Sequence, residues 1–177
     1  MRITNGSLGG RKPIIPKNLK ARPTTDVARE ALFNILRNRI DFGSVRVLDL
    51  FSGTGSISYE FASLGCPYIL AVEWDRFHCE AIRKNLKLLD ISTVQLYQTD
   101  VFSFLSRNQN SFDLIFADPP YDHKHLADLP ELVFASPLLK PEGLFILEHG
   151  PDQSFADHRK WVETRVYGKV HFTFFAS

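Results

Sequence analysis

The chain has 177 residues, of which 44% are hydrophobic, and it carries a formal net charge of +1. This length and apolar content suit one compact domain with a sizeable core. Its two cysteines, Cys66 and Cys79, exclude a disulfide framework, and the first residues, MRITNGSLGG, lack the apolar stretch of a signal peptide. No apolar run approaches the ~18 residues that span a bilayer, so we expect a soluble protein of the reducing cytoplasm.

The charge is unevenly distributed along the chain. Residues 1–40 hold nine Lys or Arg and two acidic residues, a balance of +7, whereas the other 137 residues hold 12 basic and 18 acidic ones, a balance of −6. A basic end on an acidic body is typical of a protein whose N-terminal part meets a polyanion such as a nucleic acid. Basic N-termini that are merely solvated are also common, so charge alone leaves both interpretations open.

The first 40 residues are predicted to form a small extension made of a hairpin and a helix. Residues 1–25 are rich in Gly, Pro, Lys and Arg, and the segment ITNGSLGGRKPII has β-like ends around turn residues, which favours a hairpin. The following PTTDVAREALFNILRNRI has the spacing of an amphipathic helix, and Thr24, Thr25 or Asp26 could cap its start. We therefore expect a basic extension at 1–40 and a second unit at 41–177.

The unit at 41–177 alternates short apolar runs with helical stretches. The runs predicted to be parallel strands are VRVLDLF, YILAVEW, VQLYQ, FDLIFA and LFILEH. Runs that are apolar on both faces and separated by helices indicate a parallel sheet covered on both sides. The last two runs, WVETRVYGK and VHFTFF, are joined by a tight turn at Gly168, which predicts an antiparallel pair. The expected fold class is therefore α/β, with a doubly wound, mostly parallel seven-stranded sheet that ends in an antiparallel hairpin.

Ligands of open parallel sheets lie at the carboxyl ends of the strands, so the residues that follow each strand are candidates for binding. The first strand ends in DLFSGTG, residues 49–55, whose two glycines allow a sharp turn close to a ligand before a helix begins. A lone GxG also serves any tight strand-to-helix turn. Ser58 stands where the dinucleotide-binding fingerprint has its third glycine, which disfavours a diphosphate.

Acidic residues follow the second and third predicted strands. Glu73 is placed to accept hydrogen bonds from a ribose diol, because Asp75 can cap the next helix and leaves Glu73 free. Asp100, followed by the apolar Val101, could accept a hydrogen from the amino group of adenine or could equally cap the helix that follows. A glycine turn with these acids describes a nucleoside site without a diphosphate, and S-adenosylmethionine fits such a site.

The fourth predicted strand ends in a rigid corner, Asp118, Pro119, Pro120 and Tyr121. The amino nitrogen of a nucleobase is a weak nucleophile, and the Asp118 carboxylate and the Pro119 carbonyl could accept hydrogen bonds from its two hydrogens. Tyr121 offers a ring on which a base can stack, worth ~1–3 kcal/mol. A base in a duplex or in folded RNA must be extruded to reach such a corner. The pattern predicts transfer of a methyl group to an exocyclic amine.

These motifs resemble a known family. DLFSGTGSIS and ADPPY, with acids at Glu73 and Asp100, look like the motifs of Rossmann-like class I S-adenosylmethionine-dependent methyltransferases that act on exocyclic amines. MRITNGSLGGRKP followed by ARPTTDVAREALFNIL is similar to the RsmD family of bacterial 16S rRNA guanine-N2 methyltransferases. The resemblance covers nearly the whole chain. It implies a substrate guanine in 16S rRNA, within a small ribosomal subunit or an assembly intermediate.

The resemblance also implies roles for individual residues. Those implied to bind the cofactor are Asp49, Phe51, Ser52, Gly53, Thr54, Gly55, Glu73, Asp100 and Val101. Those implied to hold the guanine are Asp118, Pro119, Pro120 and Tyr121. The RNA side is expected to include Arg11, Lys12, Arg22, Thr24, Thr25 and Arg29.

Two other functions stay open at this point. DPPY alone does not distinguish guanine N2 from adenine N6, so a DNA adenine-N6 or other nucleic-acid amino methyltransferase is one alternative, although the chain has no room for a separate DNA-recognition domain. A non-catalytic RNA-binding assembly protein on a methyltransferase scaffold is the other, although Asp118 and the glycine turn are intact. His123 and His125 follow the corner without a third ligand, so we expect no metal, and we expect no membrane partner.

Overall fold

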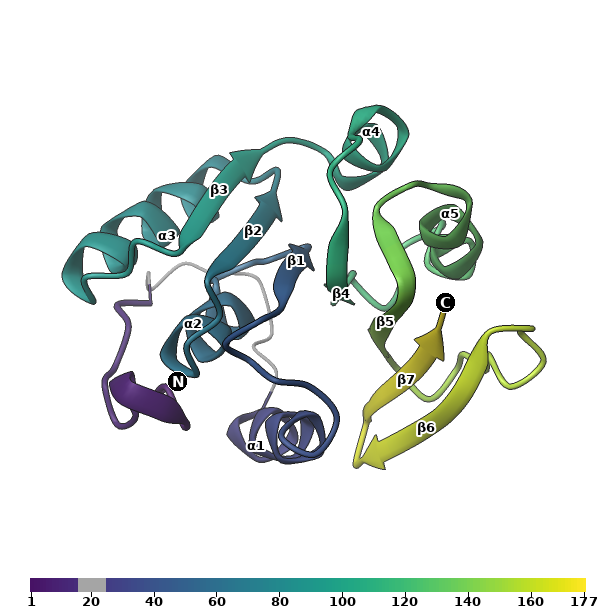
Figure 1. Cartoon of the computed structure of the whole chain (residues 1–177), viewed down its shortest axis with the longest axis horizontal. Coiled ribbons are helices and arrows are strands. Elements are labelled where there is room, and N and C mark those ends of the chain that lie inside the picture. Colours follow the sequence, from purple (N-terminus) through teal and green to yellow (C-terminus); the bar gives the residue numbers. More distant parts are fainter. Residues whose placement is uncertain (16–24) are drawn as a thin grey trace.

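The computed structural model describes residues 1–15 and 25–177 and shows an α/β fold built on one seven-stranded sheet (Figure 1). The strands are β1 (Arg46–Leu50), β2 (Tyr68–Glu73), β3 (Val94–Gln98), β4 (Phe112–Ala117), β5 (Leu139–His149), β6 (Trp161–Tyr167) and β7 (Val170–Ala176). The helices are α1 (Asp26–Leu36), α2 (Ser56–Ser63), α3 (Arg76–Leu88), α4 (Val101–Arg107) and α5 (Leu129–Ala135), and a short 3-10 helix, η1, covers Gly6–Leu8.

The strand order across the sheet is β3-β2-β1-β4-β5-β7-β6. β1 to β5 pair in parallel with one another, whereas β7 pairs antiparallel with both β5 and β6. The chain builds outward from β1 to β3 and then returns to place β4 on the other side of β1. The predicted parallel sheet with a terminal antiparallel hairpin is confirmed, and the switch in strand order, where ligands of such sheets bind, lies between β1 and β4.

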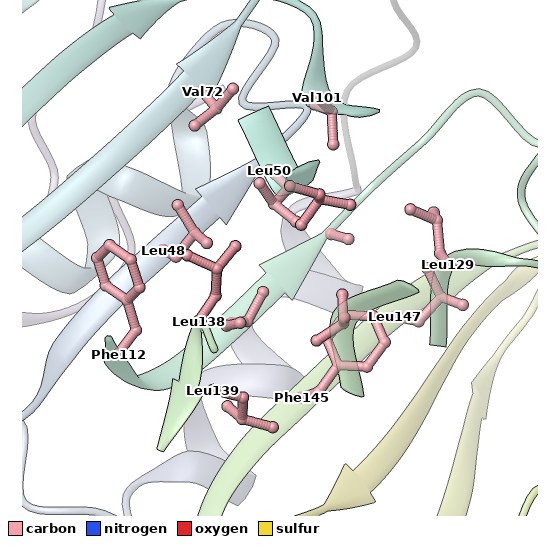
Figure 2. Packing of buried hydrophobic residues seen from close by; sticks show 14 of the residues in the cluster. Leu48, Leu50, Val72, Val101, Phe112, Leu129, Leu138, Leu139, Phe145 and Leu147 are labelled. Atoms are coloured by element: carbon pink, nitrogen blue, oxygen red, sulfur yellow. The ribbon is translucent and has the colours of Figure 1, made fainter. Parts of the chain in front are cut away.

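Apolar side chains pack on both faces of the sheet. On one face, Leu48 and Leu50 of β1 belong to a cluster that reaches α4 and α5 through Val101 and Leu129 (Figure 2). On the opposite face, Val47 belongs to a cluster with apolar residues of α1 and α2. Successive side chains of a strand point to opposite faces, so the runs that are apolar on both faces reflect a sheet covered by helices on both sides.

Three of the helices begin at polar residues that cap them, as the sequence suggested. Thr25 accepts a hydrogen bond from the backbone N–H of Ala28 at the start of α1, over 3.2 Å. Asp75 and Asp100 each accept a bond of 2.9 Å from the backbone N–H three residues later, at the starts of α3 and α4. Such a cap satisfies one of the donors that a helix start leaves unpaired, and it is worth about 1 kcal/mol.

Residues 1–15 do not form the predicted hairpin strands. The backbone N–H of Ile3 donates to the carbonyl of Arg11, and that of Gly10 donates to the carbonyl of Ile3, each over 2.9 Å, so the loop containing η1 is closed by two bonds. These two bonds and the 3-10 turn provide hydrogen-bond partners for backbone groups of this glycine-rich segment without the regular pairing of two strands. Residues 16–24 of the predicted extension lie outside the described part of the chain.

Helix α1, the other half of the predicted extension, shares the core of the sheet. Ala28, Leu32, Phe33 and Leu36 are buried in the cluster that contains β1 and α2. The predicted helix is therefore confirmed, and its apolar face is covered by the sheet domain. The division of the chain into an RNA-side extension at 1–40 and a second unit at 41–177 stays a prediction.

Along residues 1–15 and 25–177, no helix has the length and apolar content that crossing a membrane requires. Over the same residues, His, Cys, Asp and Glu side chains do not gather in groups of three or more that could hold a metal ion. Cys66 and Cys79 are both buried and free.

Candidate active site

The ends of the first four strands converge at one edge of the sheet. Leu50 is in register with Val72 of β2 and with Ala117 of β4, so the residues that follow these three strands start side by side. The backbone N–H of Asp118 donates to the carbonyl of Leu50 over 3.3 Å, which attaches the DPPY corner to the end of β1. The backbone N–H of Thr99, after β3, donates to the carbonyl of Glu73 over 3.0 Å. The convergence expected from the sequence is present.

The glycine turn after β1 requires its glycines. Gly53 and Gly55 have φ angles of +53° and +82°, in the left-handed region that disfavours residues with a Cβ. A Cβ on Gly55 would also lie 2.6 Å from the hydroxyl oxygen of Tyr59. Phe51 has a φ of +59° without being glycine. Strain of this kind costs of order 1–3 kcal/mol and gathers at functional sites, so the turn is held in a conformation that its neighbours must stabilise.

The buried side chain of Asp49, in β1, links the strand to the helix on the other side of the glycine turn. Asp49 is 1% exposed and accepts a 2.5 Å hydrogen bond from the hydroxyl of Ser58, in the first turn of α2. Burial raises the pKa of Asp49 from 3.8 to about 7, against the opposing effect of hydrogen bonds from Ser58 and Ser52. Ser58, noted in the sequence only as the missing third glycine, thus has a structural role. Direct contact of Asp49 with a ligand stays a prediction.

The side chain of Glu73, the last residue of β2, is hydrogen-bonded to the glycine turn that follows β1. Its Oε2 accepts a 2.7 Å hydrogen bond from the backbone N–H of Gly53, and its Oε1 accepts bonds from the backbone N–H groups of Trp74 and Asp75. His78 Nδ1 lies 3.6 Å from Oε1, and the Glu73 carboxylate raises the pKa of His78. Asp75 caps α3 as expected, but Glu73 is not left free, because it holds the glycine turn and is only 4% exposed. A contact of Glu73 with ribose stays a prediction.

Aromatic rings from three separate segments meet beside the glycine turn, and the sequence did not reveal their meeting. The ring of Phe102, at the start of α4, stacks on His123 with centroids 5.1 Å apart and planes 16° apart. Phe51 and His125 contact Phe102 edge-on, with centroid distances of 6.1 Å and 5.3 Å. His123 Nδ1 accepts a 3.2 Å bond from the backbone N–H of His125. The loop that follows the DPPY corner therefore packs its two histidines against the predicted cofactor side.

The two residues predicted to contact adenine have structural roles in this fold. Asp100 is exposed and caps α4, which is the alternative that the sequence left open. Val101 is 2% exposed and belongs to the core cluster shown in part in Figure 2. A role of either residue in adenine binding stays a prediction, and the neighbouring Phe102 is the residue of this segment whose ring reaches the strand ends.

The DPPY corner combines buried and exposed groups. Pro119 is buried, whereas Pro120 is exposed and its carbonyl accepts a 2.9 Å hydrogen bond from the backbone N–H of His123. The Tyr121 side chain is tied down by its hydroxyl, which donates to the Glu148 carboxylate at the end of β5 over 2.9 Å. Tyr121 remains 40% exposed. The corner is thus fixed on β1, on its own loop and on β5.

The residues predicted to face RNA differ in their exposure to solvent. Arg11 and Lys12 are exposed, as an RNA contact requires. Thr25 is exposed and caps α1. Arg22 and Thr24 lie outside the described residues.

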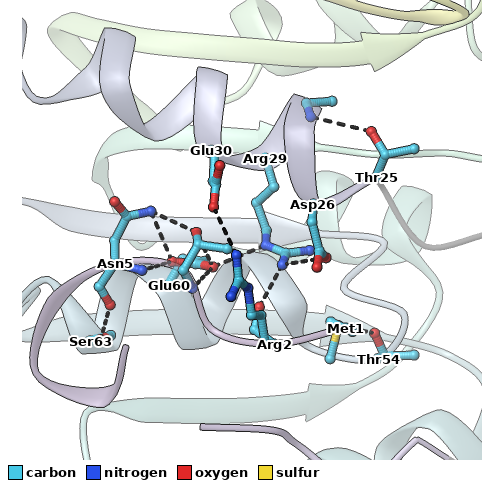
Figure 3. Close-up of polar contacts among 12 residues, drawn as sticks. Met1, Arg2, Asn5, Thr25, Asp26, Arg29, Glu30, Thr54, Glu60 and Ser63 are labelled. Atoms are coloured by element: carbon cyan, nitrogen blue, oxygen red, sulfur yellow. Dashed lines mark hydrogen bonds and ion pairs between the residues drawn. The ribbon is translucent and has the colours of Figure 1, made fainter. Parts of the chain in front are cut away.

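The prediction that Arg29 faces RNA is wrong. Its side chain is fully buried; Nε donates to Glu60 over 3.0 Å, and Nη2 donates to the carbonyl of Arg2 and to Asp26 (Figure 3). Glu60 is also fully buried and accepts further hydrogen bonds from Thr4 and Asn5. A buried carboxylate needs a paired cation, so Arg29 joins α1, α2 and the first residues of the chain.

Comparison with known proteins places the whole chain in one family. The family model described as Conserved hypothetical protein 95 matches residues 1–176. The Haemophilus influenzae protein named ribosomal RNA small subunit methyltransferase D is 32% identical over 166 residues, which cover 91% of this chain and 84% of that protein.

Two solved structures show the same fold. A hypothetical protein of Thermus thermophilus superposes with a TM-score of 0.89 at 29% identity, over 100% of this chain and 99% of that one. The Thermus thermophilus 16S rRNA N2 G1207 methyltransferase RsmC superposes with a TM-score of 0.71 at 21% identity, over 89% of this chain and 45% of that one. The fold is thus that of class I methyltransferases, and the family match confirms the resemblance found in the sequence: the chain belongs to the RsmD family.

Proposed function

We propose that this protein transfers a methyl group from S-adenosylmethionine to the exocyclic N2 amine of a guanine in 16S rRNA. The observation that carries the proposal is the attachment of the DPPY corner to the end of β1, directly before the glycine turn, through the 3.3 Å bond from Asp118 N–H to the Leu50 carbonyl. This bond brings the groups that can hold an amine beside the turn that can hold a cofactor. The name of the Haemophilus influenzae relative supports small-subunit rRNA as the substrate.

The residues at the strand ends fit S-adenosylmethionine. A carboxylate offers about four acceptor positions, and Glu73 uses three of them on backbone N–H groups. One acceptor position on Oε2 is left for a ribose hydroxyl. A second acceptor position would become available if the hydrogen bond from the Gly53 N–H to Oε2 were replaced by one from the other ribose hydroxyl. Gly53 and Gly55 have no side chains that would block the approach of the methionine end of the cofactor to the backbone. Phe51 and Phe102 provide apolar rings for adenine.

When bound, S-adenosylmethionine supplies an electrophilic methyl group on its sulfonium. The residues of the corner act on the substrate amine: the Asp118 carboxylate and the Pro119 carbonyl each accept one of its hydrogens. These contacts strengthen as the nitrogen gains positive charge, so they favour the transition state over the ground state. Tyr121 stacks on the base and fixes its plane. A strong base is not required, because the proton leaves the nitrogen after methyl transfer.

The proposal extends to the RNA side of the protein. Arg11 and Lys12 are exposed and contact phosphates, which makes binding weaken with salt. Without the buried Arg29, residues 1–40 still hold eight Lys or Arg against two acidic residues, which favours a polyanion at this end. We assign the substrate to a small ribosomal subunit or an assembly intermediate, and the protein to the cytoplasm. The names of relatives that act on small-subunit rRNA support this assignment.

A labelled-methyl assay tests the proposal. Purified protein is incubated with S-adenosylmethionine labelled on the methyl group and with small-subunit particles, naked 16S rRNA or DNA lacking modification. We expect label in the rRNA of the particles, recovered as N2-methylguanosine after digestion to nucleosides. Asp118→Ala is the matched control; it should abolish incorporation and leave cofactor binding, measured by calorimetry, nearly unchanged.

The same assay separates the alternatives. Label recovered in DNA as N6-methyldeoxyadenosine would replace the proposed function with a DNA adenine methyltransferase. Absence of label from every substrate, with retained binding of particles, would favour a non-catalytic assembly protein. Label at N2 of guanine in naked rRNA but not in particles would keep the reaction and remove the subunit from the proposal.

A further inference from the structure

Tyr121 is held from two sides by the end of β5. Its hydroxyl donates to Oε1 of Glu148 over 2.9 Å, and Glu148 is only 3% exposed. Its ring lies against Gly150, where an added Cβ would be 2.7 Å from Cδ2 and 3.3 Å from Cε2 of Tyr121. Glu148 and Gly150 are two residues apart and so lie on the same side of the extended chain. His149, between them, instead has its Nε2 2.7 Å from Thr173 Oγ1 of β7.

The backbone of Gly150 does not require glycine. Its φ lies outside the left-handed region in which residues with a Cβ are strained. The surroundings of Gly150 do require glycine, because a Cβ at this position would lie less than 3.0 Å from a neighbouring atom, which would have to move. The nearest of these atoms all belong to the Tyr121 ring. Glycine at 150 is therefore explained by the position of one aromatic ring.

The Glu148 bond fixes the remaining freedom of that ring. A phenol that donates to a carboxylate forms a stronger hydrogen bond than one between neutral groups. With the ring lying on a backbone surface and its hydroxyl attached to a buried acid, the side chain is held in a single orientation before any base arrives. Tyr121 is nevertheless 40% exposed, so part of its surface remains open.

We propose that Glu148 and Gly150 are positioning residues, which set the plane of Tyr121 as a stacking platform for the substrate guanine. This inference rests on the proposed function, since it names the base that the platform receives. A ring fixed in advance saves the entropy of ordering it and holds the amine at the Asp118 corner in reach of the methyl group. Misplacement of a reacting group by about 1 Å can cost on the order of a hundredfold in rate.

Kinetics of single and double variants test the proposal. Gly150→Ala should lower kcat/KM for the RNA by about tenfold or more, with the cofactor Kd unchanged. Glu148→Ala should have a similar effect, and Glu148→Gln, which keeps an acceptor oxygen, should recover much of the loss. In a Tyr121→Ala background, Gly150→Ala and Glu148→Ala should each have little further effect, because the ring through which they act is absent. Gly43→Ala, at an exposed turn where a Cβ meets only one atom at 3.5 Å, is the matched control.

A spectroscopic readout separates this proposal from the proposed function. The ¹⁹F spectrum of protein labelled with fluorotyrosine contains a Tyr121 resonance, assigned by its loss in Tyr121→Phe. We expect this resonance to shift in Gly150→Ala and Glu148→Ala, with melting temperatures confirming that both variants fold. An unshifted resonance, or single-variant losses that persist in full in the Tyr121→Ala background, would overturn the positioning role. A wild-type protein that methylates no RNA would refute the proposed function, and the ¹⁹F shifts would still decide whether the two residues place the ring.

Discussion

Changing Asp49 to asparagine should make the protein more stable at neutral pH than the natural sequence. The Asp49 side chain is 1% exposed, and burial raises its pKa from 3.8 to about 7. Between these two pH values the native state keeps a proton on Asp49 that the unfolded chain has already released. Stability falls with rising pH wherever the native state binds more protons than the unfolded state, so this group destabilises the fold progressively as the pH rises through that interval.

The size of the effect follows from the interval. Each pH unit between the two pKa values costs about 1.4 kcal/mol, so ionisation of Asp49 costs the native state about 4 kcal/mol by the time the pH exceeds 7. The asparagine side chain of the Asp49→Asn variant would resemble the protonated acid in shape, would keep an oxygen for the Ser58 hydroxyl, and would carry no charge at any pH. The variant and the natural sequence should therefore be similar near pH 4, and the variant should be more stable above pH 7.

Urea unfolding at a series of pH values from 4 to 8 measures this difference, with the fluorescence of the two tryptophans as the signal. Only the difference between the two proteins is informative, because Asp113 and Glu163 have lowered pKa values and act on stability in the opposite sense. Asp157→Asn, at an exposed position, supplies the background for removing a surface carboxylate. A stability difference for Asp49→Asn that stays constant over this pH range would refute the reasoning, since it would mean that Asp49 ionises alike in both states.

Other substitutions test the roles assigned to the site and to the N-terminal segment. Asp118→Ala should abolish methyl transfer with cofactor affinity nearly intact; an equal loss of cofactor binding, measured by calorimetry, would make Asp118 structural. Glu73→Ala should raise the cofactor Kd about tenfold or more and spare RNA binding; an unchanged Kd would remove Glu73 from the cofactor site. Arg29→Ala should lower the unfolding free energy by about 3–5 kcal/mol, because it leaves Glu60 buried without its cation, and retained stability in a melting experiment would contradict this. Lys12→Ala should instead weaken RNA binding and reduce its salt dependence by about one ion without a change in melting temperature, and an unaltered salt slope would place this residue away from the RNA.

The parts of the fold that were predicted correctly are those that depend on neighbours in sequence. Apolar runs, helical spacing and turn residues lie within windows of a few residues, and they identified the seven strands and the five helices among the described residues. The site was predictable for a related reason. Parallel strands bring their carboxyl ends to one edge, so the residues after each run could be placed together before the strand order was known.

The features that the sequence did not reveal depend on pairs of residues far apart in the chain. Arg29 and Glu60 are 31 positions apart, and Tyr121 and Glu148 are 27 positions apart. A helix pattern shows that Arg29 belongs to a helix, but its burial follows only from the approach of α2 and of the first residues of the chain. The cap of α4 by Asp100 was visible as one of two alternatives, because a cap and a ligand contact require the same residue type at the same place.

The Arg29–Glu60 pair also bears on how the two predicted parts of the chain act together. Helix α2 begins at Ser56, directly after the glycine turn, and Glu60 in its second turn accepts hydrogen bonds from the backbone of Thr4 and Asn5 (Figure 3). The hydroxyl of Thr54, within the turn, donates to the sulfur of Met1 over 3.7 Å. The first residues of the chain are therefore packed onto the same helix that supports the cofactor turn. A displacement of these residues would remove the hydrogen bonds that Thr4 and Asn5 donate to the buried Glu60, so the position of the first residues is coupled to the helix that follows the glycine turn.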